Sequence, residues 1–204
     1  HIYRGCDEKS ESFGDVNGVE YVDLGLPSGT LWAKTNLEAS SAEQDGGFYA
    51  WGELDVKERY TSEYYKWILN DNGNLVLTKY MTGYPSMCPD GLFSLEMEDD
   101  AARQKLGGSW RIPMVCDWTE LLDHCTSEWC EYQGTWGYKL SAANGEWIFL
   151  PATGMCKGTP AYKGEYGCYW STAVEDMEAA AFVFSSSDLY MAQVDRSHGA
   201  SIRA

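Results

Sequence analysis

A chain of 204 residues, 44% of them hydrophobic and 23% charged, is long enough to bury the core of one globular domain. Its net charge of −16 argues against nucleic acid, because a surface that neutralises phosphates needs clustered Lys and Arg, and the 15 present are scattered. Aromatic residues at 14% together with 21 glycines favour strands and loops, and no apolar run reaches the length of a transmembrane span.

The first 16 residues are polar and lack periodicity, which predicts an extended N-terminal lead-in, whereas residues 17–204 are expected to form a single domain. Cys6 is followed by two acidic residues, like the acylated cysteine of a mature bacterial lipoprotein. Arg4, however, stands where a small residue is expected before the cleavage site. A lipid anchor at Cys6 and an unmodified thiol in a frayed terminus are the two alternatives.

The first half of the chain predicts one hairpin and a long loop. Strand-like residues 19–26, the turn 27–29 and residues 30–33 indicate an antiparallel hairpin. Residues 48–52 form a short aromatic strand or turn. Residues 53–92 are rich in tyrosine but lack a period, which is typical of an ordered loop held in place by its rings.

Two helices follow. Acidic residues 98–100 precede the first helix, residues 101–106, which ends at a Gly-Gly pair. Pro113 precedes the second helix. Its apolar face is expected to comprise Trp118, Leu121, Leu122 and Cys125, and its solvent face Asp117, Glu120 and Asp123.

The last third is predicted to be rich in strands. Residues 138–143, Asn144-Gly145 and residues 146–150 give the clearest hairpin, because an Asn-Gly turn accepts positive φ at both positions. Further strands are expected over 167–172, 179–184, 190–194 and 200–203. Strand alternation predicts that residues 181–184 include both core and surface positions.

Seven cysteines are an odd number, and none forms a Cys-x-x-Cys pair or has zinc-like spacing to histidine. We therefore expect no structural metal cluster and no cofactor. Two disulfides are open in an oxidising compartment: Cys156 with Cys168 across paired strands, and Cys125 with Cys130 around a helix end. The alternative for each is a free, small apolar side chain in the core.

Several motifs follow one another along the chain: residues 21–33 (YVDLGLPSGTLWA), 49–53 (YAWGE), 95–102 (LEMEDDAA), 107–113 (GGSWRIP), 149–154 (FLPATG), 167–171 (GCYWS) and 199–203 (GASIR). In this order they resemble the Fibrobacter succinogenes major paralogous domain family. The resemblance implies an α+β, C-type-lectin-like fold, with two helices packed on small antiparallel sheets and long ordered loops. Met114 departs from the family, in which a helix-capping Thr is usual, so a weaker cap is expected.

The resemblance also implies a role. Such domains belong to exported or outer-membrane surface proteins of Bacteroidetes, some of them lipoproteins, and some relatives are variable proteins of diversity-generating retroelements. Ligands are generally bound without catalysis, through an irregular strand–loop region near the C-terminus. We therefore expect a non-catalytic adhesion or recognition domain whose partner is a protein or a glycan.

The candidate ligand-binding residues combine aromatic and thioether groups, which give apolar contact, with Ser, Asp and Gln, which give hydrogen bonds. They are Glu175, Asp176, Met177, Ser185, Ser187, Asp188, Tyr190, Met191, Gln193, Asp195, Ser197 and His198. A solvated sheet edge is the alternative interpretation. Tyr190, Gln193 and Asp195 are expected to contact the ligand together. Trp32, Trp110 and Trp170 are assigned to the core, whereas Trp129, Trp136 and Trp147 could form an exposed stacking platform.

Calcium and catalysis receive little support. The Glu-Pro-Asn or Gln-Pro-Asp loop and the Trp-Asn-Asp strand of calcium-dependent lectins do not occur. The acidic pairs 99–100 and 175–176 could bind a hard cation, but acids at a helix start more often pair with its dipole. Formylglycine-generating enzymes share the broad fold and need two close thiolates, which Cys156 and Cys168 are not placed to supply. Such an enzyme, a carbohydrate-active enzyme and a structural subunit of a surface assembly remain alternatives.

Overall fold

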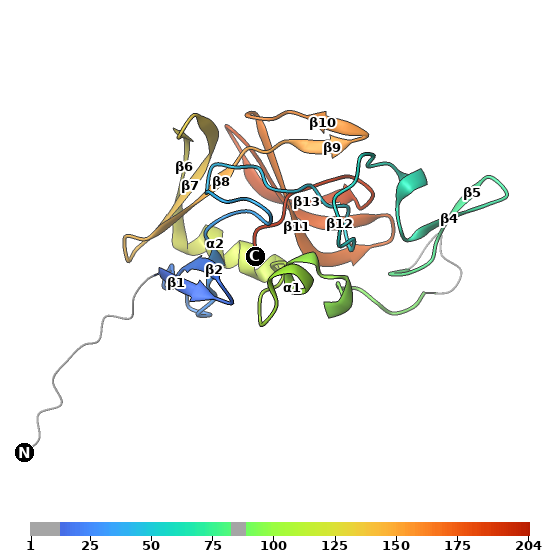
Figure 1. Ribbon diagram of the computed structural model, residues 1–204, viewed down its shortest axis with the longest axis horizontal. Coiled ribbons are helices and arrows are strands. Elements are labelled where there is room, and N and C mark those ends of the chain that lie inside the picture. Colours follow the sequence, from blue (N-terminus) through green and yellow to red (C-terminus); the bar gives the residue numbers. More distant parts are fainter. Residues whose placement is uncertain (1–12, 83–88) are drawn as a thin grey trace, which may run out of the picture.

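The computed structural model describes residues 13–82 and 89–204 (Figure 1). It is a mixed α+β fold, in which helices α1 and α2 lie beside several small antiparallel sheets, as the sequence predicts. No helix within these two segments is long and apolar enough to cross a membrane. Cys6 and the lipid anchor predicted there lie outside the described residues.

The N-terminal sheet begins earlier in the chain than the sequence predicts. Residues 13–16 were expected in the lead-in, but they form β1 (Phe13–Val16), which pairs with β2 (Val19–Val22). The turn between the two strands places Asn17 and Gly18 at φ of 55° and 77°, a conformation that both residues tolerate. The predicted hairpin with β3 (Trp32–Ala33) is confirmed, although both of its strands are shorter than expected.

The tyrosine-rich loop contains a hairpin that the sequence did not predict. The 3-10 helix η1 (Ser62–Tyr64) precedes β4 (Ile68–Asp71) and β5 (Asn74–Leu77), which project from one end of the molecule (Figure 1). Rings hold the neighbouring chain in place, as expected. Tyr80 is fully buried and packs edge-on against Trp51 and Trp67, at centroid distances of 4.8 and 6.0 Å.

The helices lie close to their predicted positions. The 3-10 helix η2 (Met97–Asp99) leads into α1 (Ala101–Leu106), and α2 spans Val115–His124. Asp117 was expected in solvent but is buried, because its Oδ2 accepts hydrogen bonds from the Met114 N–H and from Arg111, both at 2.6 Å. This carboxylate ties down the start of the helix, where Met114 has no side-chain oxygen to act as a cap.

Beside α2 lies a sheet of order β6-β7-β8, formed by Cys125–Tyr132, Thr135–Ala142 and Trp147–Pro151. The hairpin β7–β8 is confirmed, but its turn is not the predicted one, since Gly145 has a φ of 91° while Asn144 has no positive φ. Strand β6 was not predicted. Because Cys125 and Cys130 occupy the same strand at an odd spacing, their side chains point to opposite faces, so the disulfide considered for them is wrong. All five cysteines among the described residues are free thiols.

The central sheet has the order β11-β12-β13, formed by Tyr166–Glu175, Glu178–Ser185 and Leu189–Asp195. The short hairpin β9 (Met155–Lys157) and β10 (Thr159–Ala161) lies beside it. A strand predicted over residues 200–203 is absent. Instead, isolated bridges join Ala200 to Tyr49 and Ser201 to Tyr169, so this segment threads between other elements without belonging to a sheet.

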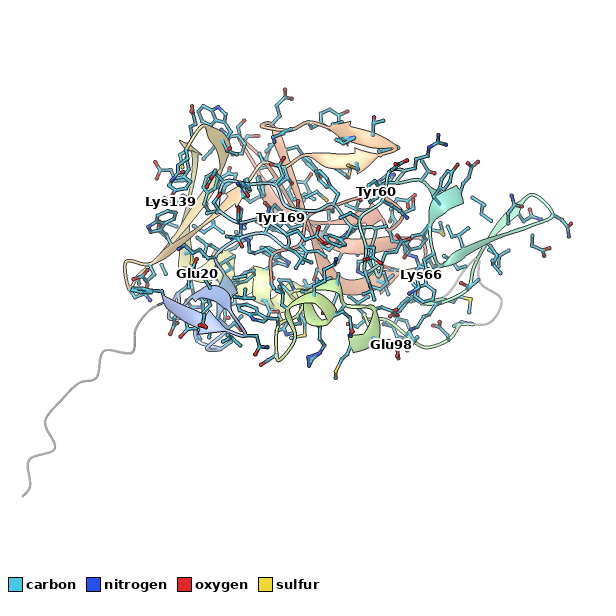
Figure 2. All side chains as sticks on the ribbon, in the orientation of Figure 1. Glu20, Tyr60, Lys66, Glu98, Lys139 and Tyr169 are labelled. Carbon is cyan, nitrogen blue, oxygen red and sulfur yellow. The ribbon has the colours of Figure 1, made fainter. Side chains whose placement is uncertain are left out.

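Strand β12 is buried on both faces, which corrects the alternation predicted for residues 181–184. Ala181 and Val183 enter a cluster that contains Trp51 and Trp170. Phe182 and Phe184 enter a second cluster that contains Trp32, Trp118 and Tyr169, the last of which Figure 2 shows in the middle of the molecule. A strand covered on both sides has no solvent face to alternate with. Trp32, Trp110 and Trp170 lie in the core as expected.

Candidate functional site

The candidate residues lie at the two ends and along the edge of the β12–β13 hairpin. Glu175, Asp176 and Met177 form the turn before β12, and residues 185–188 form the turn after it. Strand β12 has eight residues, so at about 3.3 Å per residue the two turns are separated by roughly 25 Å. The structure therefore does not bring the twelve residues into one site.

The turn after β12 is exposed and makes its hydrogen bonds within itself. The Ser185 N–H donates to the Asp188 carbonyl at 2.9 Å, and the Ser187 hydroxyl donates to the Asp188 carboxylate at 2.5 Å. Tyr190 follows on β13 and is 53% exposed. We call Ser185, Ser187, Asp188 and Tyr190 the loop end.

The opposite end of the hairpin is tied to the body of the molecule. The Asp176 carboxylate accepts a hydrogen bond from the Thr82 hydroxyl at 3.0 Å, and the Arg196 N–H donates to the Met177 carbonyl at 3.1 Å. Ser197 was predicted to contact ligand but is 1% exposed, and its N–H and hydroxyl both donate to Asp195 Oδ1. The pair Asp195 and Ser197 closes a turn and serves the fold.

Strand β13 presents its candidate residues on two faces. Tyr190 pairs with Val183, and Gln193 pairs with Ala180. Residues three apart on a strand point to opposite sides, so Tyr190 and Gln193 lie on opposite faces of β13, and the joint ligand contact expected of them with Asp195 stays a prediction. Met191 is only partly exposed, because it packs against the second core cluster.

His198 is half-buried at the end of the hairpin. Burial lowers the pKa of its imidazole, and the Asp195 carboxylate opposes that effect. Its Nδ1 atom is buried without a hydrogen-bond partner among the described residues. No Ser or Cys among the described residues is therefore hydrogen-bonded to this nitrogen atom as a nucleophile is to its base.

The buried thiols are poor nucleophiles. Burial raises the pKa of Cys156 to about 11 and that of Cys168 to about 12, so both thiols are protonated at neutral pH. Metal binding and covalent catalysis by cysteine need the thiolate. Cys156 lies on β9 and Cys168 on β11, and each is free.

One acidic group among the described residues has the spacing of a metal site, formed by Glu96, Glu98 and Asp99. The Lys79 ammonium lies within it, 2.6 Å from Glu96, 3.1 Å from Glu98 and 2.6 Å from Asp99. Lys66 adds a second cation, 3.2 Å from Asp99, at the edge where Figure 2 labels Lys66 and Glu98. These ammonium groups take the place that a hard cation would need.

Asp99 and Asp100 have structural partners. Burial favours the neutral form of Asp99, yet hydrogen bonds from Lys79, Tyr80 and Lys66 lower its pKa overall. Asp100 accepts hydrogen bonds from the Arg103 and Ile112 N–H groups, at 3.0 and 2.9 Å, and so caps α1. Both carboxylates therefore stabilise the fold.

Two of the three tryptophans expected on a stacking platform come together. Trp129 on β6 and Trp136 on β7 are stacked, with ring centroids 6.0 Å apart and an interplanar angle of 15°. Trp147 on β8 lies on the opposite face of the sheet, where it packs against Tyr132 and beneath the Lys139 ammonium. The platform is therefore a pair, and it lies near the loop end, because Trp129 also contacts Phe184 at the end of β12.

Comparison of the chain with known protein families, with curated proteins and with solved structures gives no match. A functional assignment therefore depends on the geometry of the chain's own residues. The feature that stands out in that geometry is the contrast between β12, which is buried on both faces, and the exposed loop end beside it.

Proposed function

We propose that this chain is a non-catalytic ligand-binding domain with a C-type-lectin-like fold, displayed by an exported or cell-surface bacterial protein. The motif resemblance supports the family and the location. The mixed α+β architecture with small antiparallel sheets is compatible with that fold. A lipid anchor at Cys6 is part of the same proposal.

The observation that carries the proposal is the loop end. The side chains of Ser185, Ser187 and Asp188 hydrogen-bond to one another, with no side-chain hydrogen bond to the body of the protein among the described residues, and Tyr190 is more than half exposed. The strand behind it is held between two cores, so the loop end can change its side chains with little effect on folding. Tyrosine, serine and aspartate on a rigid frame are the composition of many recognition surfaces.

The test is a binding screen with matched variants. Parent protein is screened on a glycan array and against purified surface proteins, and the variant Asp188→Ala/Tyr190→Ala is compared with Gln193→Ala. Gln193 is exposed on the same strand but points to the other face, so it controls for general surface effects. We expect the double variant to lose capture of the ligand and Gln193→Ala to keep it, with unfolding free energies within about 0.5 kcal/mol of the parent. If the double variant captures the ligand as well as the parent does, the loop end is not the binding site.

A structural subunit of a surface assembly is a second candidate, supported by one observation. Among the described residues β13 pairs with β12 alone, which leaves its other edge open to a strand from another chain. Stable self-association in size-exclusion chromatography would favour this role. An enzyme receives no such support from the protonated thiols or from His198.

A further inference from the structure

A pocket of about 410 Å³ opens at the outer end of the β6–β7 sheet, beside the turn that follows β12. Three separate segments line it. They contribute Trp129 and Trp136, then Gly164 and Glu165, then Ser186. The pocket is distinct from the loop end as defined above, but Ser186 belongs to the same turn as Ser185 and Ser187.

The floor of this pocket is aromatic. Trp129 pairs with Tyr138 across the two strands, and Trp136 pairs with Glu131, so the indole rings are diagonal neighbours on one face. The rings are nearly parallel, and Trp136 is 44% exposed. An indole face that is open to solvent in this way can accept a flat apolar partner.

The floor is also fixed in place. Trp129 packs edge-on against Tyr138 and Phe184, at centroid distances of 5.3 and 6.4 Å, and both of those rings are buried. The core therefore orders the Trp129 ring, and Trp136 stacks on that ring. A ligand that stacks on this pair would lose little binding energy to ordering the protein.

The rim of the pocket is polar and carries no positive charge. Glu165 and Ser186 are exposed, and no cation is among the described residues that line the pocket. The Gly164 N–H donates to the Ala152 carbonyl at 2.7 Å, which fixes the turn, while the space beyond the Gly164 Cα is open. The rim therefore offers a carboxylate acceptor and a hydroxyl to whatever lies on the indole rings.

This combination selects one class of ligand. The face of an indole ring is electron-rich and attracts the polarised C–H groups on the face of a pyranose ring. The carboxylate and the hydroxyl can bond the hydroxyl groups at its edge. An anionic ligand such as a sulfated glycan or a nucleotide would be repelled by Glu165 and by the net charge of −16.

We propose that this pocket binds a neutral saccharide, with one pyranose stacked on Trp136 and its hydroxyl groups bonded to Glu165 and Ser186. The inference deepens the proposed function, on which it rests, by naming the ligand class at this end of the β12–β13 hairpin. A protein ligand bound through Tyr190 is the other outcome of the experiment below.

The test uses the whole chain and named probes. Neutral hexasaccharides of glucose, mannose, galactose and N-acetylglucosamine are titrated by calorimetry into the parent, Trp136→Ala, Glu165→Gln and Trp147→Ala. Trp147 is the matched control, since it is a partly exposed tryptophan of the same sheet on the opposite face, toward Lys139. We expect at least one probe to bind the parent, Trp136→Ala to weaken that binding by about tenfold or more, and Trp147→Ala to leave it unchanged.

Glu165→Gln keeps the test decisive if Trp136→Ala is unstable, because an exposed carboxylate can be neutralised without touching the core. We expect it to weaken binding several-fold. Failure of all four hexasaccharides to bind the parent, or an equal loss in Trp147→Ala, would overturn the saccharide site. If a protein is captured through Tyr190 while no saccharide binds, the saccharide site is wrong and the proposed function stands. If neither class of ligand binds, both are wrong.

Discussion

The change Arg203→Lys tests whether a buried guanidinium holds the end of the described chain in place. Arg203 is fully buried, and no carboxylate of the described residues forms an ion pair with it. Its Nε donates to Asn36 Oδ1 at 2.9 Å, Nη1 donates to the Ala33 and Lys34 carbonyls at 3.2 and 3.1 Å, and Nη2 donates to the Phe149 carbonyl at 2.9 Å. Burial lowers the pKa of Arg203 to about 10, which still leaves it charged at neutral pH.

Lysine keeps the charge but loses the planar fork, so one ammonium cannot reach acceptors in three directions. Losing two of the four charge-assisted hydrogen bonds, at about 1.5 kcal/mol each, lowers the free energy of unfolding by about 3 kcal/mol. For a domain of this size, that corresponds to a decrease in Tm of about 6–12 °C. Urea and thermal unfolding of Arg203→Lys measure both quantities.

The control is Arg59→Lys, because Arg59 is exposed and its guanidinium donates a hydrogen bond to the Tyr64 hydroxyl at the surface, at 3.0 Å. We expect its unfolding free energy to stay within about 0.5 kcal/mol of the parent. A loss below about 1 kcal/mol in Arg203→Lys would refute the reasoning, since it would mean that the fork geometry contributes little.

Three further predictions concern the core. Gly167→Ala places a Cβ into the ring of Phe184, so urea unfolding should show a loss of about 1–3 kcal/mol. Iodoacetamide at neutral pH should modify exposed Cys116 in the native protein but reach Cys156 and Cys168 only after unfolding, as peptide mass mapping would show. Because burial raises the pKa of Cys168 from 9.0 to about 12, the folded state keeps a proton that the unfolded state releases. Stability should therefore fall above pH 9, by up to about 1.4 kcal/mol per pH unit for this thiol, and Cys168→Ala should flatten that fall.

Elements with strong local signals were predicted from the sequence. The β7–β8 hairpin has an Asn144-Gly145 turn, and the two helices have a glycine stop or a proline start. Strand β6 was not predicted, because it depends on pairing with β7 and has no strong local signal. Cys125–Tyr132 has little alternation in the sequence and becomes a strand by pairing along its whole length with β7.

Solvent exposure was harder to predict than secondary structure. The hydrophobic periodicity of α2 predicted that Asp117 faces solvent. Its carboxylate is buried instead, because it pairs with Arg111 and accepts a hydrogen bond from the Met114 backbone N–H. Strand alternation divided residues 181–184 between core and surface, although the sheet has a core on each side. Both errors arise from long-range packing, which a local period does not contain.

The sequence indicates which residue types the candidate site contains, but it does not show how their side chains are arranged. The sequence Asp195-Arg196-Ser197 has the residue types of a recognition surface, and the same types also close turns, which is their role here. Likewise, the spacing from Tyr190 to Gln193 reveals opposite faces only once the segment is known to be a strand. The pairing of Trp129 with Trp136 could not be predicted either, because β6 itself was not.

Two buried arginines hold the backbone of other segments in place without contacting the loop end by hydrogen bond. Arg196 donates to the Lys79 and Tyr80 carbonyls, at 2.8 and 3.1 Å, and Arg203 holds the carbonyls named above. Both arginines follow β13 in the chain, and Arg196 directly follows its last residue, Asp195. Because neither guanidinium contacts Asp188 or Tyr190 by hydrogen bond, substitutions there leave these anchors intact. The effects of changes at the two places should therefore add, as expected for sites that share no partners.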